Sequence, residues 1–359
     1  MSFGIYNSMD IKQLLEVTIR RNASDLHLLA GHPPLIRIDS VLMGVPGEKD
    51  LSRDDVGTLV YSLFTPEQKD LFLANKEIDF SYALGDARFR INVYFQRGSM
   101  AAALRYLPQK IRNVEELGLP KLYHDFVNLR QGFILVTGPT GHGKSTTLAA
   151  IINEINNSRE THIITIEDPI EYMYPKGRSI ISQREMHTDT YSWNVALRSV
   201  LREDPDVVLI GEMRDYETIA AALTIAETGH LVFATLHTNS AAQTIDRIVD
   251  VFPENQQSQI RLQLAATLEG VLSQRLLPQI GGGRVPAIEI LMATPAVQTT
   301  IREGKTHLID NIIQTSGEMG MQLMETSLTQ LVKAGKIDLD TAKEYSIRPE
   351  ELIRQFSTS

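Results

Sequence analysis

The residues most able to do chemistry lie in one glycine-rich stretch in the middle of the chain. Residues 138–145 read G-P-T-G-H-G-K-S and match G-x-x-x-x-G-K-[S/T] at every fixed position. Glycines recur in such loops because backbone N–H groups can surround a phosphate only where side chains do not intrude. Lys144 is expected to reach the β and γ phosphates of a nucleoside triphosphate, and Ser145 to bind Mg²⁺. The predicted nucleotide-binding residues are Gly138, Pro139, Thr140, Gly141, His142, Gly143, Lys144, Ser145 and Thr146.

Hydrolysis of a triphosphate also needs an acidic group that places the metal and orients the attacking water. Residues 206–212 predict a buried strand that ends at Glu212, with Gly211 where many P-loop ATPases carry Asp. Glu212 is therefore the candidate metal ligand and water-orienting acid. A second acidic cluster contains Glu167 and Glu171 and follows another apolar run. It is the alternative source of the group that orients the water.

Two histidines and several arginines complete the candidate set. His230 and His237 flank the apolar run 231–236 and lie at opposite ends of a predicted strand, so both cannot bind one ion. His237 is expected to sense the γ-phosphate, whereas His230 is either part of the catalytic set or an ordinary structural histidine. Arginines near a triphosphate stabilise its charge. The candidates are Arg198 and Arg202, which share a face of a predicted helix, and Arg214.

The elements around these residues alternate between strand and helix, which indicates an α/β fold with a parallel sheet. Strands are expected at 133–137, 163–167, 207–210, 231–236 and 285–292, and a helix with apolar residues at Leu148, Ile151, Ile152 and Ile155 follows the glycine-rich loop. Residues 1–107 predict an α+β domain with a helix at 9–21 and strands at 24–28, 35–38, 78–83, 88–95 and 100–107. Residues 108–130 are expected to be a linker, residues 131–294 the nucleotide-binding domain and residues 295–359 a helical C-terminal region.

Composition limits the class of protein. The chain has 359 residues, 43% of them hydrophobic, and a formal net charge of −9, which argues against a broad nucleic-acid footprint. It contains no cysteine, which excludes disulfides and thiolate metal sites. We see no secretory signal and no apolar run long enough to span a bilayer, so we expect a cytoplasmic protein without membrane insertion.

Together these motifs resemble the secretion-superfamily hexameric ATPases, and within them the type IV pilus retraction ATPases. The resemblance covers almost the whole chain. It is carried by the segment 23–28, the Walker A loop, the acidic box 165–171, the Gly-Glu form of Walker B at 207–212, the histidine box 228–239 and Gly320-Met321-Gln322.

The resemblance implies a PAS-like N-terminal domain, a RecA-like P-loop ATPase domain and a homohexamer with nucleotide at the subunit boundaries. It implies that Arg90 and Arg105 reach the nucleotide, and that the protein hydrolyses ATP to remove pilin subunits during twitching motility. It also implies an inner-membrane platform partner and a peripheral position at the inner membrane.

Three alternatives stay open. A pilus-assembly or type II secretion ATPase belongs to the same superfamily, and residues 296–303 read A-V-Q-T-T-I-R-E where retraction ATPases carry A-I-R-N-L-I-R-E. Against that alternative, the extension-type relatives usually carry a four-cysteine insertion, which this chain lacks. A nucleic-acid translocase would use the same core, but the acidic charge disfavours it. A GTPase has little support, because residues 75–78 resemble a guanine motif only superficially.

Overall fold

The computed structural model describes residues 10–38, 41–85, 87–107 and 110–357. The chain divides into two compact units. The first contains the chain up to Lys110 together with Glu171–Met173, and the second contains Ile111–Ile170 and Tyr174–Ser359. The second unit therefore includes the C-terminal helices and, from Ile111 onward, most of the segment expected to be a linker. Among the described residues, no helix is both long enough and apolar enough to cross a bilayer.

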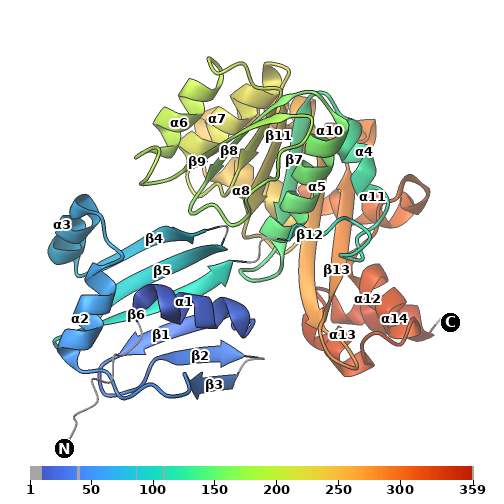
Figure 1. Ribbon diagram of the computed structural model, residues 1–359. Coiled ribbons are helices and arrows are strands. Elements are labelled where there is room, and N and C mark those ends of the chain that lie inside the picture. The colour runs from blue at the N-terminus through green and yellow to red at the C-terminus, as the bar shows by residue number, and fades with distance from the viewer. Residues whose placement is uncertain (1–9, 39–40, 86, 108–109, 358–359) are drawn as a thin grey trace, which may run out of the picture. The chain divides into compact units, whose positions relative to one another are not determined.

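The first unit is an antiparallel sheet of six strands in the order β3-β2-β1-β6-β5-β4, with three helices (Figure 1). Its buried side chains pack α1, α2 and α3 against the sheet through residues such as Leu15, Val56 and Phe72. The elements are α1 (Ile11–Arg20), β1 (Asp25–Leu29), β2 (Leu35–Ile38), β3 (Val41–Gly44), α2 (Arg53–Tyr61), α3 (Pro66–Asn75), β4 (Glu77–Leu84), β5 (Ala87–Gln96) and β6 (Ser99–Leu107).

The second unit contains a seven-stranded sheet in the order β13-β12-β7-β11-β10-β8-β9. All neighbouring pairs are parallel except β12 with β13. Its strands are β7 (Gly132–Thr137), β8 (His162–Glu167), β9 (Ile180–Glu185), β10 (Val207–Ile210), β11 (Leu231–Leu236), β12 (Leu268–Pro278) and β13 (Arg284–Met292). The five strands predicted for this region are confirmed, whereas β9 and β12 were not anticipated.

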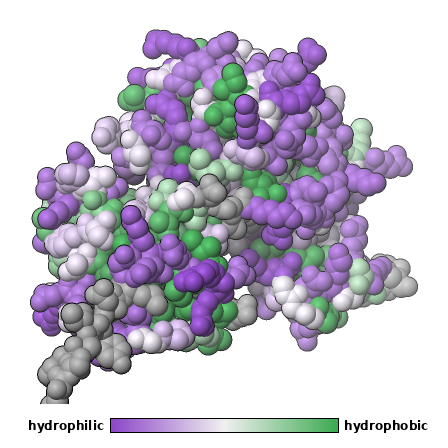
Figure 2. Space-filling view, viewed as in Figure 1, coloured by the Kyte–Doolittle hydropathy of each residue, from purple (hydrophilic) through white to green (hydrophobic). Residues whose placement is uncertain are grey.

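Helices cover both faces of this sheet. One buried cluster joins one face to α6–α10, and a second joins the other face to α4 and α5. Hydrophilic residues dominate the visible surface of this unit (Figure 2). The helices are α4 (Tyr123–Asn128), α5 (Lys144–Ser158), α6 (Trp193–Val200), α7 (Tyr216–Glu227), α8 (Ala241–Asp250), α9 (Glu254–Thr267) and α10 (Pro295–Arg302).

The C-terminal helices pack at the far ends of β12 and β13. Leu277, Val285 and Ala287 of these strands share a buried cluster with Met324, Leu328 and Leu352 of the helices. The elements are a short 3₁₀ turn η1 (Thr306–Leu308), α11 (Ile309–Thr315), η2 (Gly317–Met319), α12 (Met324–Lys333), α13 (Leu339–Tyr345) and α14 (Pro349–Ser357). The helical C-terminal region expected from the sequence is therefore present.

The sheet order explains where a site can form. The carboxyl ends of β7, β8, β10 and β11 meet at one edge of the sheet because these strands are parallel. Strands β8–β11 lie on one side of β7, and β12 lies on the other. The loop after β7 therefore occupies the switch point of the sheet, where open α/β sheets bind their ligands.

Candidate nucleotide-binding site

The loop after β7 has the backbone shape that phosphate binding requires. Gly138, Gly141 and Gly143 have φ angles of +139°, +81° and +84°, which side chains other than glycine's rarely allow. Helix α5 begins directly after the loop, and no side chain among the described residues caps its N-terminus. The amide groups of its first turn and of the loop can therefore bind an anion.

Lys144 is the first residue of α5 and is only 8% exposed. Its Nζ donates to the carbonyl oxygens of Gly138 and Pro139, at 2.7 and 2.9 Å, so the side chain folds back across the loop. The same Nζ lies 3.5 Å from Nδ1 of His237. The ammonium is thus held over the cradle of loop amides, where a phosphate would meet it.

Glu212 lies just beyond β10 and faces the same loop through a histidine. Its carboxylate contacts Arg214 Nη2 at 2.5 Å and His237 Nε2 at 3.3 Å. Because the other nitrogen of His237 contacts Lys144, the imidazole stands between the loop lysine and the acid. The carboxylate is 17% exposed, so it is partly desolvated but open to a water molecule.

Gly211 explains why the acid stands one position later than in many P-loop ATPases. A Cβ at Gly211 would lie 3.2 Å from both the Cα of Glu167 and the carbonyl oxygen of Ile166. An aspartate there would fit only if the neighbouring backbone shifted slightly. Glu167 itself is 9% exposed, and its Oε1 accepts hydrogen bonds from Thr165 Oγ1 at 2.7 Å and Gln183 Nε2 at 3.3 Å. It is a fixed second carboxylate at the same sheet edge.

The residues available to hold a metal fit Mg²⁺ bound together with a nucleotide. Ser145 is half-buried in the first turn of α5, and Glu212 supplies one carboxylate. Among the described residues, no group of three His, Cys, Asp or Glu side chains could hold an ion without help. A hydroxyl and one carboxylate suit Mg²⁺, which keeps several waters and takes phosphate oxygens besides one or two carboxylates.

Two predicted site residues, His230 and Glu171, do not join this cluster within the second unit. His230 lies at the amino end of β11, and its ring contacts Ile225 O and Thr228 Oγ1, both at 3.0 Å. A six-residue strand separates it from His237, a distance of roughly 20 Å, so it does not reach the loop of its own chain. Glu171 groups with the first unit.

The prediction that Arg198 and Arg202 share a helix face is wrong. Helix α6 ends at Val200, and Arg202 lies in the following turn, where its N–H donates to Ser199 O. Arg198 is exposed and lines a shallow groove beside Tyr216 of α7. Both arginines are therefore surface residues of this chain, and only Arg214 of the three contacts Glu212.

Arg90 and Arg105 lie directly opposite one another on β5 and β6 of the first unit. Like charges in such a pair repel. Each arginine has an acidic partner: Arg90 contacts Asp79 at 2.6 Å and Arg105 contacts Asp25 at 3.0 Å. Burial would raise the pKa of Asp25, but hydrogen bonds from Ser24 and Arg105, together with the charge of Arg105, outweigh burial and lower the pKa. The two guanidinium groups remain 42% and 69% exposed, which leaves them able to meet a further anion.

Strand β12 contributes a site residue that we did not predict. Gln274 is 3% exposed, and its side chain joins the loop to helix α5. Its Nε2 donates to His142 O at 2.8 Å, and its Oε1 accepts from Thr147 Oγ1 at 2.8 Å. A Cβ at Gly143 would lie 2.9 Å from Gln274 Nε2. Gln274 therefore fixes the loop to α5, and no local sequence signal could have paired residues so far apart.

His142 points away from the phosphate cradle and into β12. Its Nδ1 accepts a hydrogen bond from the Leu276 amide at 2.9 Å. Burial, followed by the charges of Arg275, Lys144 and Arg284, lowers the pKa of His142, which keeps the ring neutral and able to accept this bond. The side chain of His142 is thus an anchor of the loop, and only its backbone is available to phosphate.

Gln274→Ala should weaken nucleotide binding without unfolding the protein. Two hydrogen bonds are lost, at a cost of about 2 kcal/mol in stability, and the loop amides lose their fixed direction. We expect the dissociation constant for ADP, measured by fluorescence titration, to rise about tenfold, which corresponds to about 1.4 kcal/mol. Gln259→Ala, at an exposed glutamine of α9, is the matched control. A folded Gln274→Ala protein with unchanged ADP affinity would contradict the role of Gln274.

Comparison with known proteins shows which family the chain resembles. The family described as "Type II/IV secretion system protein" matches residues 8–281. A Pseudomonas aeruginosa protein named type IV pilus retractation ATPase PilT is 47% identical over 343 residues, which cover 95% of this chain and 99% of that protein. A Neisseria gonorrhoeae protein named twitching motility protein is 45% identical and covers 95% of this chain and 92% of its own length.

A solved structure is similar over almost its whole length. The crystal structure of the pilus retraction motor PilT with bound ADP has a TM-score of 0.90 and 48% sequence identity, and it covers 97% of this chain and 100% of that chain. The α/β fold with a RecA-like ATPase domain, expected from the sequence, is confirmed by this likeness. The chain belongs to the type II/IV secretion system protein family.

Proposed function

We propose that this chain is the ATP-hydrolysing motor of type IV pilus retraction. One observation carries the enzymatic part. The loop lysine, His237 and Glu212 form a continuous series of contacts at the carboxyl edge of the sheet, with Lys144 to His237 at 3.5 Å and His237 to Glu212 at 3.3 Å. A cation for the phosphates and an acid for the water therefore face one another across a single imidazole.

The chemistry follows from these positions. The loop amides and Lys144 bind the β and γ phosphates. Ser145 and Glu212 would hold Mg²⁺, which would supply positive charge to the phosphate oxygens. Glu212 orients a water molecule, with Glu167 as the alternative. The water oxygen bonds to the γ-phosphorus while the bond to the bridging oxygen breaks. The proton lost by the water passes to the released phosphate, and ADP leaves with the bridging oxygen. When the γ-phosphate leaves, His237 loses a contact, and because His237 directly follows β11, the position of that strand end can change.

The pilus assignment rests on the relatives. The names of the Pseudomonas and Neisseria proteins refer to pilus retraction and twitching motility, and both align along almost all of this chain. The altered segment 296–303 leaves pilus assembly or type II secretion as the alternative within the same family. A nucleic-acid translocase is a weaker alternative, because the chain carries a net charge of −9.

The proposed partners follow from the same assignment. The chain forms a homohexamer with nucleotide at the subunit boundaries, and it acts in the cytoplasm at the inner-membrane base of the pilus, on a platform protein there. The exposed pair Arg90 and Arg105 supports such boundaries, because two partly neutralised arginines on one sheet face suit a phosphate supplied by another rigid unit. Hydrolysis at a boundary would then change the angle between domains.

Deletion of the gene in the source organism tests the direction of movement. We expect cells with excess surface pili, counted by electron microscopy, that no longer twitch, because pilin is added and never removed. The wild-type gene should restore motility, and a Lys144→Ala gene should not. Cells without pili would overturn retraction and favour the assembly alternative.

A mixing experiment tests the shared site. Arg105→Ala and Lys144→Ala proteins should each be nearly inactive, yet an equal mixture should regain ATPase activity, because about one boundary in four of a random ring combines an intact loop with an intact arginine.

The matched control mixes Lys144→Ala with Glu212→Gln. Both changes lie in the same unit of the chain, so every boundary stays defective and no activity should return. No recovery in either mixture across a range of ratios would mean that each chain builds its site alone. Recovery in the control mixture would contradict the placement of Lys144 and Glu212 in one site.

A further inference from the structure

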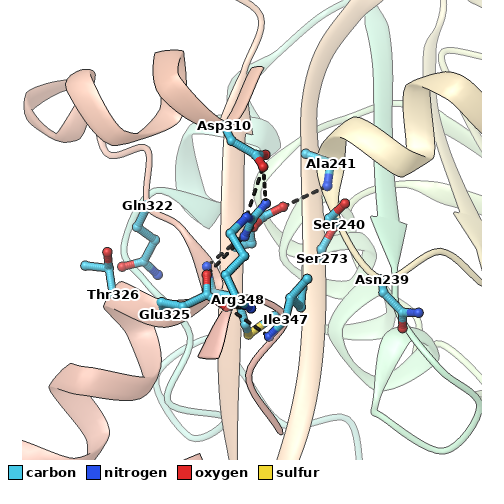
Figure 3. A network of polar contacts seen from close by, with 12 residues as sticks. Asn239, Ser240, Ala241, Ser273, Asp310, Gln322, Glu325, Thr326, Ile347 and Arg348 are labelled. Carbon is cyan, nitrogen blue, oxygen red and sulfur yellow. Dashed lines mark hydrogen bonds and ion pairs between the residues drawn. The ribbon is translucent and has the colours of Figure 1, made fainter. Parts of the chain in front are cut away.

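The C-terminal helices are joined to the nucleotide site by an arginine that no step of the chemistry uses. Arg348 lies in the turn between α13 and α14, which we call the 345–348 turn. Figure 3 shows its side chain among polar groups from several elements, with Asp310 and Glu325 on either side. Its guanidinium contacts Asp310 at 2.6 Å, Glu325 at 3.0 Å and Glu289 at 3.2 Å.

Two of these carboxylates are completely buried. Glu289 on β13 and Glu325 on α12 both have side chains that are 0% exposed, and Arg348 is 23% exposed. Burial alone would lower the pKa of Arg348, but the carboxylates around it outweigh burial and raise the pKa, so the guanidinium stays charged. Buried carboxylates need such a partner, since an unpaired buried charge is strongly unfavourable. Arg348 therefore fixes the relative positions of β13, α11 and α12.

The first connection to the site runs through Glu289. Its Oε1 accepts a hydrogen bond from the Ala241 amide at 2.8 Å, while its Oε2 accepts from Arg348. Ala241 is the first residue of α8, only four positions after His237. Glu289 thus holds the start of the helix whose preceding segment carries the histidine between Lys144 and Glu212.

The second connection runs through β12. Arg275 Nη1 donates to the carbonyl oxygen of Tyr345 at 2.6 Å. The next residue, Leu276, donates its amide to His142 of the phosphate loop. The rings of His142 and Tyr345 also lie 6.4 Å apart between centroids. The 345–348 turn therefore supports the phosphate loop as well as the histidine segment.

Glu325 holds the 345–348 turn rigidly to α12, so that the two move together. Its Oε1 accepts from the amides of Ile347 and Arg348, at 2.9 and 2.8 Å, and from Ser346 Oγ at 3.0 Å. One carboxylate thus holds three consecutive residues of the turn. Any displacement of α12 would move the turn as a whole.

We propose that Arg348 is a positioning residue for ATP hydrolysis, which acts through Glu289 on the His237 segment and through the 345–348 turn on the phosphate loop. The C-terminal helices then determine the geometry of the site through β12 and α8, although they are remote from the loop in sequence. This inference rests on the proposed ATPase function. The alternative is that the cluster only fastens the C-terminal helices to the sheet.

The test compares Arg348→Lys and Arg348→Gln with Arg354→Gln in the full-length protein. Arg354 is the matched control, because it is 73% exposed and its ion pair with Glu351 spans 3.9 Å. Assays run well below the melting temperature of each variant, with oligomeric state checked by size-exclusion chromatography. We expect kcat to fall about tenfold or more in both Arg348 variants, because small misplacements of catalytic groups are costly. We expect Arg354→Gln to match the wild type.

A double-mutant cycle identifies the route. Glu289→Gln keeps an acceptor for the Ala241 amide but removes the charge that Arg348 meets. If Arg348 acts through Glu289, the double variant should be no slower than the slower single variant. Should Arg348→Gln fail to fold, Arg348→Lys and Glu289→Gln decide the matter.

Folded Arg348→Lys and Glu289→Gln proteins with wild-type kcat would overturn the inference, whatever their melting temperatures. A wild-type protein that does not hydrolyse ATP would instead overturn the proposed function, which keeps the two failures distinguishable.

Discussion

Strand β12 passes directly behind the phosphate loop, and this close backbone approach is the constraint on which the rest of the site depends. A Cβ at Gly138 would lie 2.2 Å from the carbonyl oxygen of Gln274, so only glycine allows the two chains to approach so closely. Thr137 Oγ1 and Ser273 Oγ meet at 2.8 Å one step earlier. The loop therefore takes its shape from a strand that comes more than a hundred residues later.

The same constraint arranges the charges. With the loop fixed, α5 starts where Lys144 can fold over the carbonyls of Gly138 and Pro139, and His237 at the end of β11 lies between that ammonium and Glu212. Cation, imidazole and carboxylate come from three neighbouring strands of one parallel sheet. His237 lies between the end of β11 and the start of α8, and α8 is linked through Glu289 to Arg348 of the C-terminal region. A change in phosphate charge beside His237 would therefore be felt by both the sheet and the C-terminal helices.

The local features of this site could be predicted from the sequence. The glycine-lysine-serine spacing and the apolar runs of β7, β10 and β11 are short-range patterns, and the structure has them within a residue of the expected bounds. The capping box at the start of α3 is another short-range pattern, in which Thr65 is the N-cap and Gln68 returns a hydrogen bond.

The long-range features could not be predicted. In β12, Leu268, Val271, Leu272 and Leu276 follow the spacing of a helix as well as that of a buried strand, so periodicity did not distinguish the two. Gln274 meets its partners across more than 120 residues of sequence, and Arg348 meets Glu289 across 59. The prediction that Arg202 shares a helix face with Arg198 failed because α6 ends at Val200, two residues before Arg202.

The measurement that tests this account most directly separates ATP binding from turnover in Glu212→Gln. Glutamine keeps the size of Glu212 and a contact for His237, but it removes the charge that orients water and helps to hold Mg²⁺. Binding of a fluorescent ATP analogue should stay within a few-fold of wild type, while phosphate release should fall at least a hundredfold, the scale of losing a group that acts in the transition state. Normal phosphate release by a folded Glu212→Gln protein would show that Glu212 is not the carboxylate that orients the attacking water.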